Sequence, residues 1–158
     1  MKLVHKDEQH VVFQLEPREK KALLTILKLY PVLPADFQAL TKADDPEGRK
    51  VDQELLEQSL AEHKASNQQL LQNLFANPQR LVKSKSGWRL TLDTGDVEWF
   101  LQVLNDVRVG KWYLAGCPDE QSGKPLTLSV DNLKHYWAME VAGAFQWQLL
   151  EALEGLGY

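Results

Sequence analysis

The segment around Arg108 has the residue types that could hold an anion. Arg108 follows Val97, Leu101 and Leu104 at helical spacing, so the pattern predicts that its guanidinium points into the core with them. Burying a guanidinium without hydrogen-bond acceptors is costly. We therefore expect Arg108 to find polar partners inside the protein.

Several polar residues are placed to be those partners. They come from three predicted helices: Asn105, Glu140, His63 and Asn67. Two interpretations of such a cluster stay open: a satisfied ion pair that fixes how the helices pack, or a binding site for an anion such as a carboxylate. Asp106 is expected to face the opposite way, toward solvent.

Residues for metal or covalent chemistry are scattered. No two of the four histidines, His5, His10, His63 and His135, have the i, i+4 spacing of a helical zinc site. Cys117 is the single cysteine, which excludes an internal disulfide and a CxxC pair, and it is more typical of an incidental thiol than of a nucleophile. We expect no metal.

Other catalytic motifs are missing from the sequence. Neither GxGxxG nor GxxxxGK[ST] occurs, so no loop is marked for binding nucleotide phosphates. No nucleophile elbow surrounds any serine. The expectation is a protein that is not an enzyme and uses no cofactor.

A basic segment resembles the wing of a winged helix. Arg80, Lys83, Lys85 and Arg89 lie on a predicted β-hairpin that follows a helix, which is the order of a DNA-binding winged helix. However, the preceding helix over 51–74 is rich in acidic residues, the wrong sign for lying along phosphates. DNA binding is therefore the alternative function and not the first one.

Aromatic residues outside the main apolar stripes are candidates for contact with a partner. They are Trp99, Tyr113, Tyr136 and Trp147. Aromatic side chains in such positions either extend the core or anchor another protein, including a second copy of the same chain.

Composition and charge are those of an ordinary globular protein. The 158 residues are 44% hydrophobic and 25% charged, with a formal net charge of −4, which gives no general attraction to nucleic acid or to anionic lipid. The length suits a single domain, 1–158. Without a signal-peptide pattern or an apolar run long enough to cross a bilayer, we expect a cytoplasmic protein with no membrane contact.

Periodicity predicts an α+β fold that is mostly α. A short strand over 9–15 precedes a helix over 17–30, and a polar connection over 41–50 leads to a helix over 51–74 whose middle carries His63 and Asn67. A β-hairpin with a four-residue turn at 84–87 follows. Two long apolar helices, 97–115 and 133–153, flank a turn-rich loop over 116–125 and form the expected core.

Two stretches resemble a bacterial family catalogued as the domain of unknown function number two thousand and seventeen. They are Phe13 to Leu24, and Leu104 to Val109 with Trp99 to Val103 before it; the final Tyr136-Trp137 helix is similarly placed. The resemblance implies a small, mostly helical protein without established activity, often encoded in actinobacteria beside an adaptor of the Clp protease.

Asn105, Asp106 and Arg108 match the most recognisable motif of that family, which offers no catalytic residue to carry over. The basic hairpin and the long loop after Gly116 depart from its pattern. We expect a non-enzymatic protein-interaction or regulatory domain, with a link to proteolytic adaptor pathways implied by the resemblance. A small-anion sensor that uses Arg108 is the third hypothesis, after DNA binding.

Overall fold

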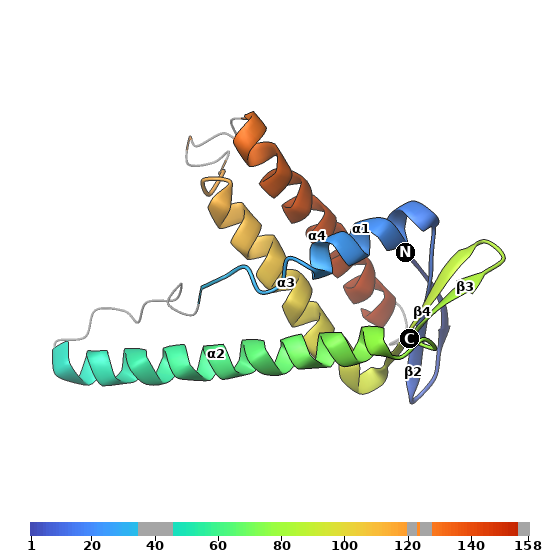
Figure 1. Ribbon diagram of the computed structural model, residues 1–158, viewed down its shortest axis with the longest axis horizontal. Coiled ribbons are helices and arrows are strands. Elements are labelled where there is room, and N and C mark those ends of the chain that lie inside the picture. Colours follow the sequence, from blue (N-terminus) through green and yellow to red (C-terminus); the bar gives the residue numbers. More distant parts are fainter. Residues whose placement is uncertain (35–45, 120–122, 124–127, 155–158) are drawn as a thin grey trace.

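The computed structural model describes residues 1–34, 46–119, 123 and 128–154, with the backbone alone for 46–49. Figure 1 shows the order of the elements: β1 (Lys2–Lys6), β2 (His10–Leu15), α1 (Pro17–Leu27), α2 (Pro46–Ala76), β3 (Leu81–Ser84), β4 (Gly87–Asp93), a 3-10 turn (Thr94–Asp96), α3 (Val97–Leu114) and α4 (Val130–Glu154). The predicted class, α+β and mostly α with four main helices, is confirmed.

The strands form one antiparallel sheet in the order β1-β2-β4-β3. Strand β2 was predicted, and its Val11, Phe13 and Leu15 alternate inward as a half-buried strand should. Strand β1, which pairs with β2, was not predicted. Four of its five residues are exposed, so no alternation of apolar side chains marks it in the sequence.

The β3–β4 hairpin is confirmed, but its turn is tighter than predicted. Ser84 and Gly87 pair with each other, which leaves Lys85 and Ser86 at the tip. Gly87 has a φ of 145°, and a Cβ there would lie 2.2 Å from the carbonyl oxygen of Leu15. Glycine is therefore needed both for the backbone conformation and for the close approach to β2.

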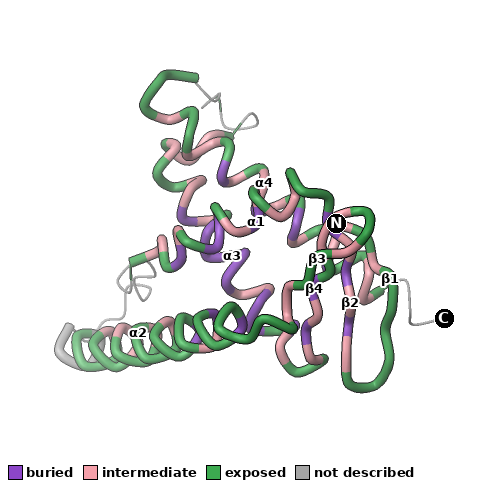
Figure 2. Tube along the Cα trace, turned by 45° about the vertical axis from the view of Figure 1, so that its right-hand side comes forward, coloured by how far each residue is buried: buried purple, intermediate pink, exposed green. Residues whose placement is uncertain are grey.

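Helices α3 and α4 lie side by side as an antiparallel pair, and α1 packs against both (Figure 1). One buried cluster joins them to the sheet, including Phe13, Leu92, Phe100 and Leu149. The purple segments in Figure 2 mark this core, which lies where the helix pair meets the sheet. Of the 21 buried apolar residues in the part of the chain that the structure describes, ten lie on α3 and α4, so these two helices form about half of the core and not most of it. The sheet, α1 with Tyr30, and the C-terminal half of α2 supply the rest.

Some predicted boundaries are wrong. Helix α1 ends at Leu27 and not at Tyr30, and α4 begins at Val130 and not at Leu133. Helix α2 begins at Pro46, inside the predicted connection, whose residues 41–45 lie outside the described residues. Half of the predicted loop over 116–125, residues 120–122, 124 and 125, also lies outside them.

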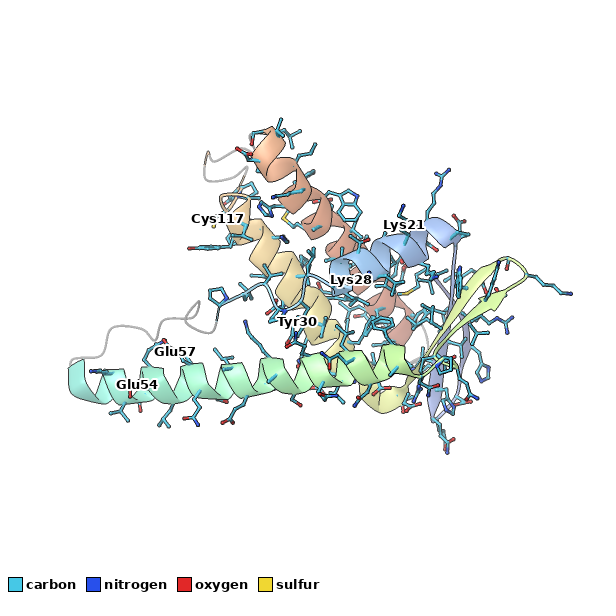
Figure 3. All side chains as sticks on the ribbon, in the orientation of Figure 1. Lys21, Lys28, Tyr30, Glu54, Glu57 and Cys117 are labelled. Carbon is cyan, nitrogen blue, oxygen red and sulfur yellow. The ribbon has the colours of Figure 1, made fainter. Side chains whose placement is uncertain are left out.

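Helix α2 spans 31 residues, about 46 Å at 1.5 Å per residue. Its C-terminal half packs beside the sheet and α3, while its N-terminal half projects away from them (Figures 1 and 2). Glu54 and Glu57 lie on this projecting half (Figure 3).

Candidate functional site

Helix α3 is turned about its axis relative to the predicted orientation. Arg108 is exposed, so its predicted burial is wrong, and Asp106, which was predicted to face solvent, is 8% exposed. The reason is that neighbours cover α3 on two sides, α4 on one and the segment after α1 on the other. The buried arc therefore centres on Val103 and not on Leu101.

Asp106 holds three parts of the chain together. Its Oδ1 accepts hydrogen bonds from the backbone N–H groups of Val32 (2.7 Å) and Leu33 (3.2 Å), which follow α1. Its Oδ2 lies 3.3 Å from the ammonium group of Lys64 on α2, and Lys64 also donates to the carbonyl oxygen of Leu33. The buried carboxylate thus has an opposite charge and several donors, as a buried charge requires.

Gly110 lies one turn after Asp106 on the same face of α3. A Cβ at this position would lie 2.5 Å from Cγ1 and 2.7 Å from Cβ of Val32. The missing side chain lets the segment after α1 pass directly over the helix. Asp106 and Gly110 together fix that crossing, one by hydrogen bonds and the other by leaving room.

Next to this crossing, Gln102 joins the two polar residues predicted on α2. Its Oε1 lies 2.6 Å from Nε2 of His63 and accepts a hydrogen bond of 3.1 Å from Nδ2 of Asn67. Asn67 is buried, whereas His63 is exposed. These residues line a cavity of about 280 Å³ with Asp106 and Tyr30. His63 and Asn67 therefore do meet polar partners, but the partner is Gln102 and not Arg108.

Tyr30 lies where the segment after α1 passes between α2 and α3 (Figure 3). Burial raises the pKa of its phenol above 10.0, a hydrogen bond with Asn67 opposes that rise, and the charge of Asp106 adds to it. The phenol is thus protonated at neutral pH. We call this set of Tyr30, Lys64, Asn67, Gln102 and Asp106 the α2–α3 junction.

Arg108 makes a surface bridge between α3 and α4. Its Nε donates to Oε1 of Gln146 (3.0 Å), and its Nη2 donates to Oδ1 of Asn105 (2.9 Å). Asn105 was a predicted partner and is confirmed. Glu140, another predicted partner, is exposed, and the acceptors described for Arg108 are neutral. The predicted five-residue cluster is therefore divided between the junction and this bridge.

An aromatic surface runs along α4. We define the outer face of α4 by residues that share one side of the helix at spacings of three, four or seven: Leu133, Trp137, Glu140, Ala144, Trp147 and Glu151. Trp147 is 67% exposed and Trp137 is 44% exposed. Among the other predicted contacts, Tyr113 is exposed and Tyr136 is half-buried.

Trp99 does not belong to any such surface. It is 8% exposed, packs edge-on against Phe100 and donates its indole N–H to Oδ1 of Asp96 at 2.9 Å. Its predicted role in partner contact is therefore wrong, because the sequence alone did not reveal that both sides of α3 are covered.

The four basic residues of the hairpin have different surroundings. Arg80 forms two parallel hydrogen bonds of 2.7 Å with the carboxylate of Asp93, and this contact lowers the pKa of Asp93. Lys83, Lys85 and Arg89 are exposed. Three of the four proposed nucleic-acid contacts are thus open to solvent, and the fourth is engaged within the protein.

The described residues were compared with the requirements of a metal site and of a membrane-spanning helix. In 1–34, 46–119, 123 and 128–154, no group of three or more His, Cys, Asp or Glu side chains could hold a metal ion. Within the same ranges, none of the helices has the length and hydropathy needed to cross a membrane. Comparison with protein-family models, with curated proteins and with solved structures finds no match.

Proposed function

We propose that this chain is a non-enzymatic protein-interaction or regulatory protein that contacts its partner, another protein or a second copy, through the outer face of α4. The exposure of Trp137 and Trp147 on that face carries the proposal. Tryptophan has a large apolar surface, and leaving it in water forgoes the free energy that burial in an interface would give. Tryptophans are also the residues that most often dominate binding energy.

A regulatory role is proposed from the resemblance of the sequence to the family named above. Asn105, Asp106 and Arg108 carry its motif, and the family's frequent genomic neighbour, an adaptor of the Clp protease, favours a part in controlled proteolysis in the cytoplasm. In this chain Asp106 holds the α2–α3 junction and Arg108 bridges α3 to α4. The motif therefore positions helices, which suits a binding protein better than a catalyst.

DNA binding has less support. Lys83, Lys85 and Arg89 are exposed on the hairpin, but Glu54 and Glu57, on the half of α2 far from the hairpin (Figure 3), would repel phosphates if α2 lay along the DNA. A small-anion sensor at Arg108 is also less favoured, because two of its donors are already engaged by Gln146 and Asn105.

Affinity capture tests the proposal. The wild-type protein and a Trp137→Gln/Trp147→Gln variant are immobilised and exposed to lysate of the source organism, and self-association is measured in parallel by sedimentation. Leu55→Gln, which changes an exposed apolar residue on α2, is the matched control. We expect wild type and control to retain the same partner, or to dimerise, and the tryptophan variant to do neither. A monomer that enriches no protein, or equal capture by all three proteins, would contradict the proposal.

A further inference from the structure

A groove lies between α1 and the C-terminal half of α2, on residues separate from the outer face of α4. Its volume is about 710 Å³. The apolar part of its lining comes from both helices and from β3, and includes Leu24, Leu27, Leu71, Phe75 and Leu81. Phe75 is exposed and Leu24 half-buried, so apolar surface is open to an occupant.

Charge on the groove has a single sign. Lys20 on α1 and Lys28, the residue that caps the C-terminal end of α1, line one wall, and the opposite wall presents the amides of Gln68 and Gln72. No aspartate or glutamate is among the described lining residues. Lys20 is held in place over the ring of Trp88, 3.4 Å from the centroid.

The acidic residue nearest to these lysines in α1 is already engaged. The carboxylate of Glu19 interacts with the N-terminal ammonium group and accepts a hydrogen bond from the backbone N–H of Glu16. The positive charge of the groove is therefore not neutralised by α1 itself, and an anionic occupant would gain from it.

We infer that the groove binds an acidic amphipathic helix of a partner protein. Lys20 and Lys28 are eight residues apart in the sequence, which corresponds to about 12 Å along α1, close to two helical turns. A helix with apolar residues at i, i+3 or i+4, and i+7 would cover the apolar lining. Carboxylates at both ends of that stripe would meet the two lysines, whereas a fatty acid has one carboxylate and can meet one of them.

This inference goes beyond the outer face of α4 and does not depend on it. The test uses a fluorescein-labelled designed peptide of about 14 residues with leucines at helical spacing and flanking glutamates, and a second peptide with lysines in place of the glutamates. Fluorescence anisotropy measures binding of each peptide to the folded full-length chain, with sodium decanoate as a competitor.

We expect the acidic peptide to bind and the lysine peptide not to bind. Lys28→Glu and Phe75→Ala should each weaken binding of the acidic peptide about tenfold, and Lys28→Glu should bind the lysine peptide more tightly than wild type does. Leu55→Ala, on the projecting half of the same α2 helix, is the control and should bind like wild type.

Three results would overturn the inference: no binding of the acidic peptide by the folded wild type, equal binding of both peptides, or unchanged binding by Lys28→Glu. Complete displacement by decanoate at concentrations below its micelle formation would assign the groove to fatty acids instead. Loss of lysate capture in the tryptophan variant with normal peptide binding separates this site from the outer face of α4.

Discussion

The α2–α3 junction contains buried polar side chains, whereas the outer face of α4 contains exposed apolar side chains. At the junction, the buried carboxylate of Asp106 and the buried amide of Asn67 have hydrogen-bond partners inside the chain. On α4, Trp147 is 67% exposed and Trp137 is 44% exposed. The buried polar groups thus stabilise the fold, whereas two of the five tryptophans keep much of their apolar surface in water, and this contrast is why we propose the binding surface on α4.

Substitution of Asp106 at the α2–α3 junction should have the largest effect on stability. Asp106→Ala should lower the free energy of unfolding by about 3 kcal/mol, because it leaves Lys64 and two backbone N–H groups without their acceptor. Asp106→Asn keeps a hydrogen-bond acceptor and loses the charge, so its free energy of unfolding should lie between those of wild type and Asp106→Ala. Urea denaturation gives these values.

Arg108→Ala is the control for that prediction, since it removes the other charged residue of the same motif. Its side chain is exposed and bonds to neutral partners, so the loss should stay within about 1 kcal/mol. An Arg108 variant that is destabilised as much as the Asp106 variants would show that the surface bridge, and not the junction, holds α3 in place.

Substitution of two helical glycines, Gly110 in α3 and Gly143 in α4, compares a tightly packed position with a less crowded one. Gly110→Ala should cost about 1–3 kcal/mol, because the added Cβ would collide with Val32 at the crossing. At Gly143 in α4, the nearest atom to a new Cβ is Cδ of Arg108 at 3.4 Å, at a flexible side chain. Gly143→Ala should therefore be neutral or gain up to about 1 kcal/mol of helix propensity. Thermal unfolding distinguishes the pair, and equal effects would mean that the close crossing is not important for stability.

On the outer face of α4, the expected change is in association and not in stability. Trp137→Gln/Trp147→Gln should alter the free energy of unfolding by about 1 kcal/mol or less, since Trp147 is 67% exposed and Trp137 44% exposed, so neither belongs to the buried core. Denaturation of the same samples used for partner capture measures this. A loss of several kcal/mol would instead make the two tryptophans part of the fold.

The smallest effect concerns pH. Burial lowers the pKa of His135 below 6.5, and the charges of Lys111 and Lys134 lower it further. The unfolded chain therefore takes up a proton at His135 more readily than the folded chain does, so this contribution to stability is present above pH 6.5 and is lost as the pH falls below it.

His135→Gln should remove that contribution. The difference between urea midpoints at pH 7.5 and pH 5.5 is expected to be slightly smaller in the variant than in wild type. A larger difference in the variant would contradict the sign of the shift. Lys111, whose ammonium nitrogen lies 3.2 Å from Nδ1 of His135, must stay unchanged in both proteins.

Much of the fold could be predicted because local patterns carry it. The alternation of Val11, Phe13 and Leu15 marks β2, the glycine at 87 marks the hairpin, and long apolar periodicity marks α3 and α4. Strand β1 could not be predicted in this way, since its exposed residues show no period and its pairing with β2 is what defines it.

The candidate site was predicted less well, because its members depend on how α3 is turned. Asn105, His63 and Asn67 do take part in polar contacts, but with Arg108 or Gln102 in separate groups. Lys64 and Gly110 were missed. The spacing of four residues between Asp106 and Gly110, which places both on one face of α3, is a signal for Gly110 but not for Lys64.

By itself the sequence determined the elements other than β1, their order and most of the apolar residues that are buried, since each of these follows from local periodicity. The tertiary structure alone decided that Asp106 is inside and Arg108 outside. Both residues lie beside apolar neighbours on α3, and a helix has no preferred rotation until other elements cover it. Helix α4 and the segment after α1 supply that cover, so the choice depends on tertiary contacts that no local pattern encodes.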